Sequence, residues 1–268
     1  MTAPSPVAPP VFPRRRPWLR PVLLGLGGIV TVIVLFWATV SVAATMARTS
    51  EHIERTFEGR ITAVEVRTEG SVEIVTGPTG GARSDLRLRY ALARPKVTQG
   101  IDGRGVLRVK VSCTGISVWC SSSLDLRVPA DVPTSVRADT VRISDVTGPV
   151  TVEAAAGEVQ LTRLGGVVRV NLGAGEIRGD ELSSAEVDAS VGAGSVRLAF
   201  VEPPRNAKAQ AGAGEAEIVL PGGPTTYLVE TSAGAGEASP QVPSDPGSSR
   251  TVRAETGAGR AVVRYANR

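Results

Sequence analysis

Apolar and polar residues alternate along most of the chain after residue 57. The stretch EVDASVGAGSVRLAF, residues 186–200, shows the pattern: it alternates, breaks at a Gly-Ala-Gly triplet, and alternates again. A period of two places successive side chains on opposite faces of a strand. This stretch therefore predicts two half-buried β-strands on either side of a glycine turn.

The glycine break recurs roughly every 20 residues, as is typical of repeat architectures. The copies read AAAGEVQL, LGAGEIRG, VGAGSVRL, AGAGEAEI, AGAGEASP and TGAGRAVV. The corner glycines that these six copies share are Gly157, Gly175, Gly194, Gly214, Gly236 and Gly259. One such unit cannot bury its own apolar face, but stacked units can.

The pattern predicts an all-β fold with a β-solenoid over residues 129–268. Its coils would hold two strands and about 20 residues each, with glycine-rich corners, because glycine accepts positive φ and close backbone approach. Shorter alternating runs in residues 57–128 predict a β-rich section that leads into the solenoid. The last strand, 261–265, is expected to cap the open end of the array.

A nucleotide-binding loop is the alternative interpretation of a single glycine triplet. GAGEIRG, residues 173–179, places its third glycine one residue too late for GxGxxG, and no β-α-β pattern surrounds it. Repeated corners explain the glycines better, so we expect no cofactor.

An uncharged segment precedes the β-rich part. Residues 21–47 are long and apolar enough to cross a bilayer as one N-terminal transmembrane helix, which needs about 20 residues. Residues 1–20 are proline-rich and are expected to be a disordered tail. This tail contains no acid and four arginines: Arg14, Arg15, Arg16 and Arg20.

These arginines set the expected topology. The positive-inside rule places the tail in the cytoplasm and the C-terminal domain outside the cell membrane, after a short stalk at 48–56. A cleaved signal peptide is the alternative, because Ser41–Ala43 and Thr45–Ala47 have small residues at the offsets that cleavage requires.

The tail also explains the net charge of +4. Removing its 4 arginines from the 30 basic residues leaves 26, which equals the number of acidic residues. The rest of the chain is neutral, so we expect no nucleic-acid partner.

Cys113 and Cys120 are the only cysteines. Outside the cytoplasm an even pair predicts a disulfide, which would staple a short excursion of the chain. The C-x6-C spacing, without a histidine nearby, does not suit a metal or redox site.

Candidate catalytic residues are few. The only histidine, His52, falls in the expected stalk and is interpreted as a solvated residue rather than a base. The glutamates that follow the corners could form a cation-binding ladder, but Ser195 and Arg260 interrupt it, so a solvated face is favoured; they are Glu158, Glu176, Glu215 and Glu237. We expect no catalytic residue and no metal site, and hence no enzyme.

Units of the form V-x-V-x-x-x-x-G-x-V-x-L follow a Val-Pro strand between residues 126 and 265. Two examples are VTGPVTVEAAAGEVQL at 146–161 and GGVVRVNLGAGEIRG at 165–179. In these features the chain resembles a bacterial family of candidate adhesins, the DUF4097 type. The resemblance implies a membrane-anchored surface protein and, for several members, a partner in an envelope-stress system. The corners are rich in Ala and Gly where family units often carry Ser or Asp.

Three functions stay open on the sequence alone. The favoured one is a non-catalytic, membrane-anchored extracytoplasmic protein, an adhesin or cell-envelope-binding module whose partner is a cell-wall polymer or another envelope protein. The second is an accessory or sensor of envelope-stress signalling that reports through the arginine tail. The third is a glycan-active enzyme on a solenoid scaffold.

Overall fold

The computed structural model describes residues 31, 33, 35–37, 48–91, 93–113 and 120–266. The chain divides into two units, Met1–Ala47 and Arg48–Arg268. In the first unit the described residues, Thr31, Ile33 and Leu35–Trp37, are helical. Among the described residues, no helix has both the length and the apolar character to cross a membrane. The expected tail with its four arginines, and most of the expected transmembrane segment, lie outside the described residues.

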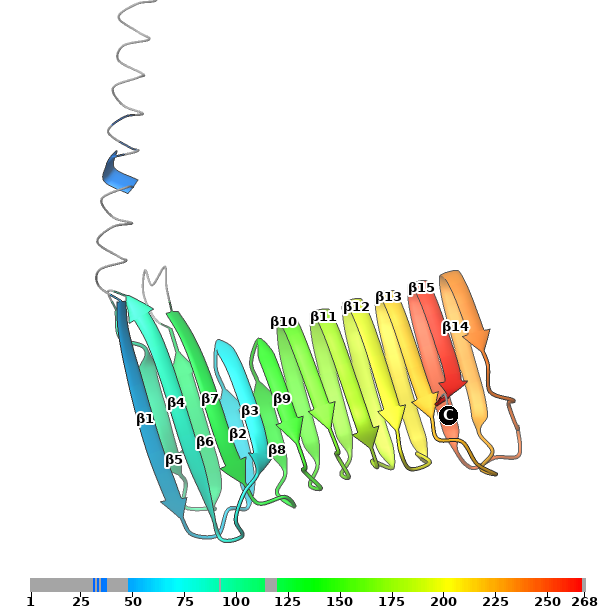
Figure 1. Cartoon of the computed structure of the whole chain (residues 1–268), viewed down its shortest axis with the longest axis horizontal. Helices are drawn as coiled ribbons and strands as arrows, with labels where there is room; N and C mark the ends of the chain where they lie inside the picture. The colour runs from blue at the N-terminus through cyan, green and yellow to red at the C-terminus, as the bar shows by residue number, and fades with distance from the viewer. Residues whose placement is uncertain are drawn as a thin grey trace, which may run out of the picture. The chain divides into compact units, whose positions relative to one another are not determined.

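The second unit is a β-structure, which confirms the all-β prediction (Figure 1). Residues 48–56, expected as a stalk, lie in the first strand. The strands are β1 (Arg48–Glu58), β2 (Ala63–Arg67), β3 (Gly70–Thr76), β4 (Gly81–Ala91), β5 (Lys96–Ile101), β6 (Val106–Ser112), β7 (Cys120–Val128), β8 (Thr134–Arg137), β9 (Thr140–Ser144), β10 (Val150–Thr162), β11 (Val168–Leu182), β12 (Glu186–Phe200), β13 (Asn206–Leu220), β14 (Leu228–Pro240) and β15 (Thr251–Tyr265).

These 15 strands form one mixed sheet with two branches that meet at β10. One branch runs β1–β4–β7–β3–β9, and β9 pairs with residues 158–162 of β10. The other runs β5–β6–β2–β8, and β8 pairs with residues 150–153 of β10. Beyond β10 the repeats lie side by side as parallel strands in register. In β10 and each later strand, the residues before the corner therefore continue the branch that ends in β8, and the residues after it continue the branch that ends in β9.

Each repeat strand turns over at its glycines, as Figure 1 shows at the upper edge of β10–β13. In β12 the buried residues before the corner are Val187, Ala189 and Val191, and those after it are Val196, Leu198 and Phe200. The buried positions change from odd to even numbers across the corner. In a straight strand they would keep the same parity, so the two halves of β12 face one core from opposite sides.

Backbone pairing continues through these corners. Gly175 pairs with Gly194, and the alanines next to them pair as well. Each repeat is therefore one strand of 13 or 15 residues, and the expectation of two separate strands was wrong. The second glycine of each triplet makes the continuous turn possible, since its φ lies between 129° and 137°, a region that L side chains avoid.

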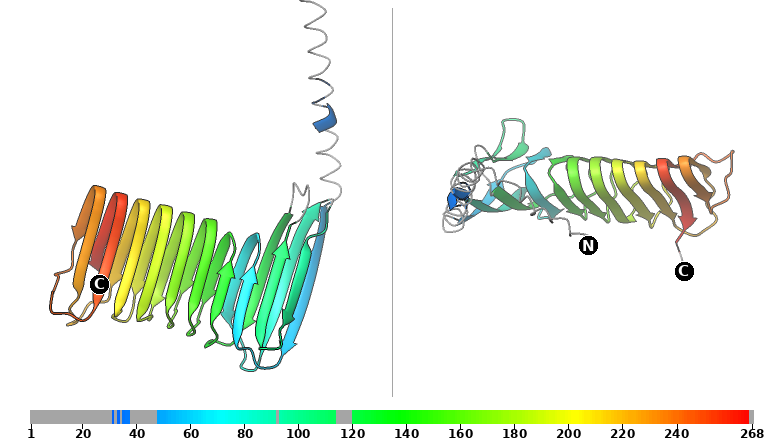
Figure 2. Two further views of the ribbon diagram at one scale, coloured as in Figure 1. Left: turned by 180° about the vertical axis from the view of Figure 1, so that it is seen from behind. Right: turned by 90° about the horizontal axis from the view of Figure 1, so that it is seen from above.

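The last two repeats are exchanged in space. Strand β15 pairs with β13 on one side and with β14 on the other, and Figure 2 shows it between them. The final strand is therefore not the cap that was expected, because β14 is the outermost. The loop that follows β14 covers part of its free edge, where the Ser244 hydroxyl bonds the N–H and the C=O of Val229.

Candidate functional site

A groove of about 750 Å³ lies where the second branch of the sheet joins the repeat array. Its walls come from the ends of β2, β6 and β8 and from the corner regions of β10 and β11. These segments are far apart in the sequence, and the parallel pairing of β2 with both β6 and β8 brings them together.

The groove exists because the corners at this place are short. Glu153 and Glu158 of β10 are separated by four residues, 154–157, whereas their partners Arg137 and Thr140 are separated only by 138 and 139. The corner between β2 and β3 is also only two residues, 68 and 69. The edge of the sheet therefore dips at β3 and β9, between the higher corners of β7 and β10 (Figure 1).

Three cations form a row along one wall of the groove. Arg67 is in direct register with Lys110 on one side and with Arg137 on the other. Strands lie about 4.8 Å apart, and like charges directly opposite one another repel. Arg137 is neutralised by Glu153, whose Oε2 lies 2.6 Å from its Nε. Among the described residues, neither Lys110 nor Arg67 has an ion-pair partner.

Two acids lie at the short corners of the same groove. Glu69 and Asp139 line it, both are exposed, and neither carboxylate forms an ion pair with a described residue. Apolar contact is offered by Val111, Ala154 and Leu172. The groove is therefore lined by both basic and acidic side chains. It can hold an extended ligand that carries both signs of charge.

The disulfide lies beside this groove. Cys113 and Cys120 are bonded, as the sequence predicts. Cys113 directly follows Ser112, a lining residue at the end of β6, and Cys120 begins β7. The bridge therefore ties the two strands on one flank of the groove. Residues 114–119, including Trp119, lie outside the described residues.

The other residues singled out in the sequence lie away from the groove. The corner glutamates occupy one row, as their spacing suggests, in register with Ser195 and Arg260. Three of them form ion pairs with arginines, at Arg142–Glu158, Arg178–Glu176 and Arg260–Glu237. The row is therefore a mainly acidic, solvated face, and arginines pair with three of its carboxylates. His52 lies on β1, where its imidazole contacts Asp85.

Sequence reasoning missed the groove. The signal that could have found it is a basic residue at the end of a strand immediately before a two-residue corner, as at Arg67 and Arg137. That signal has meaning only once the strands are known to be neighbours, and β2 and β8 are separated by more than 60 residues.

Comparisons with known proteins found matches among solved structures alone. No protein-family model and no curated protein matches the sequence. Among solved structures, a candidate adhesin from Bacteroides fragilis is 13% identical, with a TM-score of 0.40 over 81% of this chain and 97% of its own. A candidate adhesin from Parabacteroides distasonis is 14% identical, with a TM-score of 0.39 over 82% and 97%.

A third solved structure is a candidate cell adhesion protein from Clostridium sporogenes. It is 14% identical, with a TM-score of 0.35 over 81% of this chain and 100% of its own. All three resemblances span nearly the whole of the matched proteins. The names that these three proteins carry concern adhesion.

Proposed function

We propose that this chain is a non-catalytic surface protein that binds a cell-wall polymer in the groove between β6 and β11. The observation that carries the proposal is the row of Lys110 and Arg67, without ion-pair partners among the described residues, next to the free carboxylates of Glu69 and Asp139. A wall polymer that bears peptides presents carboxylates and amines at short intervals. It can therefore pair with both sets of charges at once.

The proposal includes an anchor in the cell membrane. The apolar segment 21–47, with four arginines before it, supports a single span with the N-terminus in the cytoplasm. The disulfide supports an extracytoplasmic location for the β-domain, because such bonds persist in oxidising compartments. A polymer-binding groove on an anchored domain would hold the membrane and the wall together.

We also propose that the repeats wind as a β-solenoid of the DUF4097 type. The in-register parallel pairing from β10 to β14 supports this, as does the change of buried face at each glycine corner. A solenoid presents one strand position per repeat along its length. It is therefore suited to extended ligands rather than to compact ones.

The test is a sedimentation assay with isolated cell-wall sacculi and the full-length protein in detergent. We expect saturable binding that weakens as salt is raised, since the contacts are between exposed charges. The double variant Arg67→Ala/Lys110→Ala should lose most of this binding. The control Arg127→Ala/Arg169→Ala also removes two exposed basic side chains, but neither of these lines the groove, and it should bind like the unmodified protein.

Two further arms separate the possible ligands. Sacculi stripped of attached anionic polymers should bind equally well if the peptide-bearing wall itself is the ligand. Loss of binding after stripping would overturn that choice of ligand. Absence of saturable binding to either preparation, together with retention of one specific membrane protein, would overturn the proposal in favour of the signalling role.

A further inference from the structure

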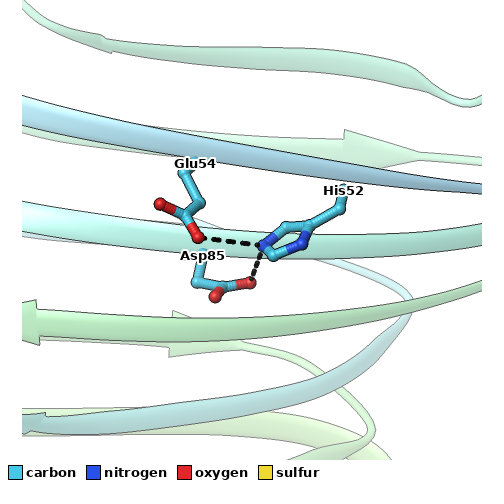
Figure 3. A group of neighbouring side chains, drawn as sticks. All are labelled: His52, Glu54 and Asp85. Carbon is cyan, nitrogen blue, oxygen red and sulfur yellow. Dashed lines mark ion pairs between the residues drawn. The ribbon is translucent and has the colours of Figure 1, made fainter.

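Three potential metal ligands converge on the outer face of β1 and β4, far along the sheet from the repeat array. Figure 3 shows the carboxylates of Glu54 and Asp85 both directed at one ring nitrogen of His52. Asp85 Oδ1 lies 2.8 Å from His52 Nε2, and Glu54 Oε1 lies 3.6 Å from it. The pairing of β1 with β4 causes this, because Glu54 is in direct register with Asp85.

Each carboxylate has its other oxygen next to an arginine. Arg83 donates a hydrogen bond to Glu54 Oε2 at 3.1 Å, and Arg87 Nη2 lies 3.7 Å from Asp85 Oδ2. The arginines therefore orient the carboxylates and leave Oε1 and Oδ1 for a shared ligand, as partners outside a coordination sphere commonly do.

The contact between His52 and Asp85 is not an ordinary hydrogen bond. Asp85 Oδ1 is buried and accepts no hydrogen bond within the described part of the chain, although the ring nitrogen is only 2.8 Å away. The in-plane direction of this ring nitrogen, which carries a proton in one tautomer and a lone pair in the other, therefore does not point straight at Asp85 Oδ1. In the tautomer with the lone pair, the nitrogen can bind an ion that lies beside this oxygen.

We propose that His52 Nε2, Glu54 Oε1 and Asp85 Oδ1 bind a divalent transition-metal ion, for which Zn²⁺ is the best match. Ligands at 2.0–2.2 Å in a tetrahedron are about 3.3–3.6 Å apart. The observed separation of 3.6 Å from His52 to Glu54 lies in that range, and the separation of 2.8 Å from His52 to Asp85 is shorter. All three atoms lie within 4.8 Å of one another. Water fills the fourth position.

The chemistry of the ligands selects this class of ion. Imidazole suits zinc and its neighbours, whereas Ca²⁺ and Mg²⁺ prefer six or more oxygen ligands. The bound ion would tie β1 to β4, with two ligands from one strand and one from the other. Strand β1 is an edge strand that pairs only with β4 among the described strands, so the ion would act as a clip on that edge.

The test uses the fact that His52 is the only histidine in the chain. Full-length protein without a histidine tag, stripped of metal and held in detergent, is titrated with ZnCl₂ in a calorimeter. We expect one Zn²⁺ per chain. In protein labelled with ¹⁵N-histidine, the single imidazole should shift on Zn²⁺ addition and stay unchanged on Ca²⁺ addition. Hydrogen exchange in β1 should slow when Zn²⁺ is bound.

The variants His52→Gln and Asp85→Asn should each weaken Zn²⁺ binding at least about tenfold, which is the loss seen even for residues outside the first coordination sphere. The control Glu51→Gln lies on the same strand, where its carboxylate pairs with Arg94, and should bind Zn²⁺ like the unmodified protein. No saturable binding at one ion per chain, or equal affinity in His52→Gln, would show that the cluster is an ion pair alone.

Discussion

The backbone of Gly194 lies directly on the carbonyl oxygen of Gly175. A Cβ atom at Gly194 would be 1.8 Å from that oxygen, and the φ of Gly194 is +135°. The same relationship links Gly175 to Gly157 and Gly214 to Gly194. The corners of the repeats therefore form one continuous stack of backbone, in which each glycine leaves room for its neighbour.

Substitution of one glycine in this stack should be costly. In Gly194→Ala the added methyl group meets a backbone atom and the residue must keep a positive φ, so we expect the free energy of unfolding to fall by about 3 kcal/mol or more. Gly222→Ala is the matched control, since a Cβ there has no neighbour within 4 Å. Urea unfolding measures both. A loss at Gly194 no larger than at Gly222 would refute the stacked-corner explanation.

A second column of stacked residues should make the fold sensitive to acid. Asp145 and Arg163 both have positive φ, and Arg163 donates two hydrogen bonds to the Asp145 carboxylate. These bonds hold the pKa of Asp145 below its usual value. The stabilisation is therefore complete above the unfolded pKa of about 4 and is lost as the pH falls through the lower, folded pKa.

The variant Asp145→Asn tests that contribution, since asparagine also tolerates positive φ. At pH 7 we expect it to lower the free energy of unfolding by roughly 0.5 kcal/mol, as is usual for an exposed pair. The difference from the unmodified protein should shrink towards zero as the pH falls through the folded pKa of Asp145. A difference that persists at low pH would mean that Asp145 acts through something other than its charge.

The disulfide should stabilise the domain and keep the flank of the groove in place. Closing a loop of this length is worth about 2–3 kcal/mol, so Cys113→Ser/Cys120→Ser should lower the free energy of unfolding by that amount. Reductant should destabilise the unmodified protein equally and leave the double variant unchanged. If the double variant unfolds at the same urea concentration as the oxidised protein, the bridge contributes nothing to stability.

The repeat array could be predicted because the sequence pattern that specifies it lies within each repeat and recurs at a regular spacing. Alternation on each side of Gly194 marks the buried side chains, and the regular spacing of the glycines shows that the units stack. The exchange of β14 and β15 could not be predicted in this way, since both carry the same glycine triplet and either fits beside β13. The order of two strands that share the same corner triplet depends on the loops, which have no periodic signal.

The groove and the proposed zinc site at His52, Glu54 and Asp85 could not be predicted for a related reason. Each combines residues that meet only through pairing of distant strands, such as Glu54 with Asp85 or Arg67 with Arg137. His52 was placed in a stalk because it lies only a few residues after the apolar segment 21–47. In the structure it lies on the edge strand β1, where the charged residues around it discourage association with other strands.

The end of the array carries one polar group that the fold does not satisfy. Tyr227, just before β14, is fully buried, and within the described residues its hydroxyl has no hydrogen-bond partner. Burial also raises the pKa of its phenol. A buried hydroxyl without a partner costs about 1–3 kcal/mol, while the ring fills space beneath the outermost repeat.

The ring and the hydroxyl of Tyr227 should therefore have opposite effects on stability. Tyr227→Phe should raise the free energy of unfolding by about 1 kcal/mol, whereas Tyr227→Ala should lower it by about 3–5 kcal/mol. Tyr90→Phe is the control, because the Tyr90 hydroxyl lies 3.4 Å from Glu51 Oε2 and its removal can bring no gain. Urea unfolding of the three variants decides the matter. A loss of stability in Tyr227→Phe would show that the hydroxyl has a partner, and that the end of the array is closed more completely than its hydrogen bonds indicate.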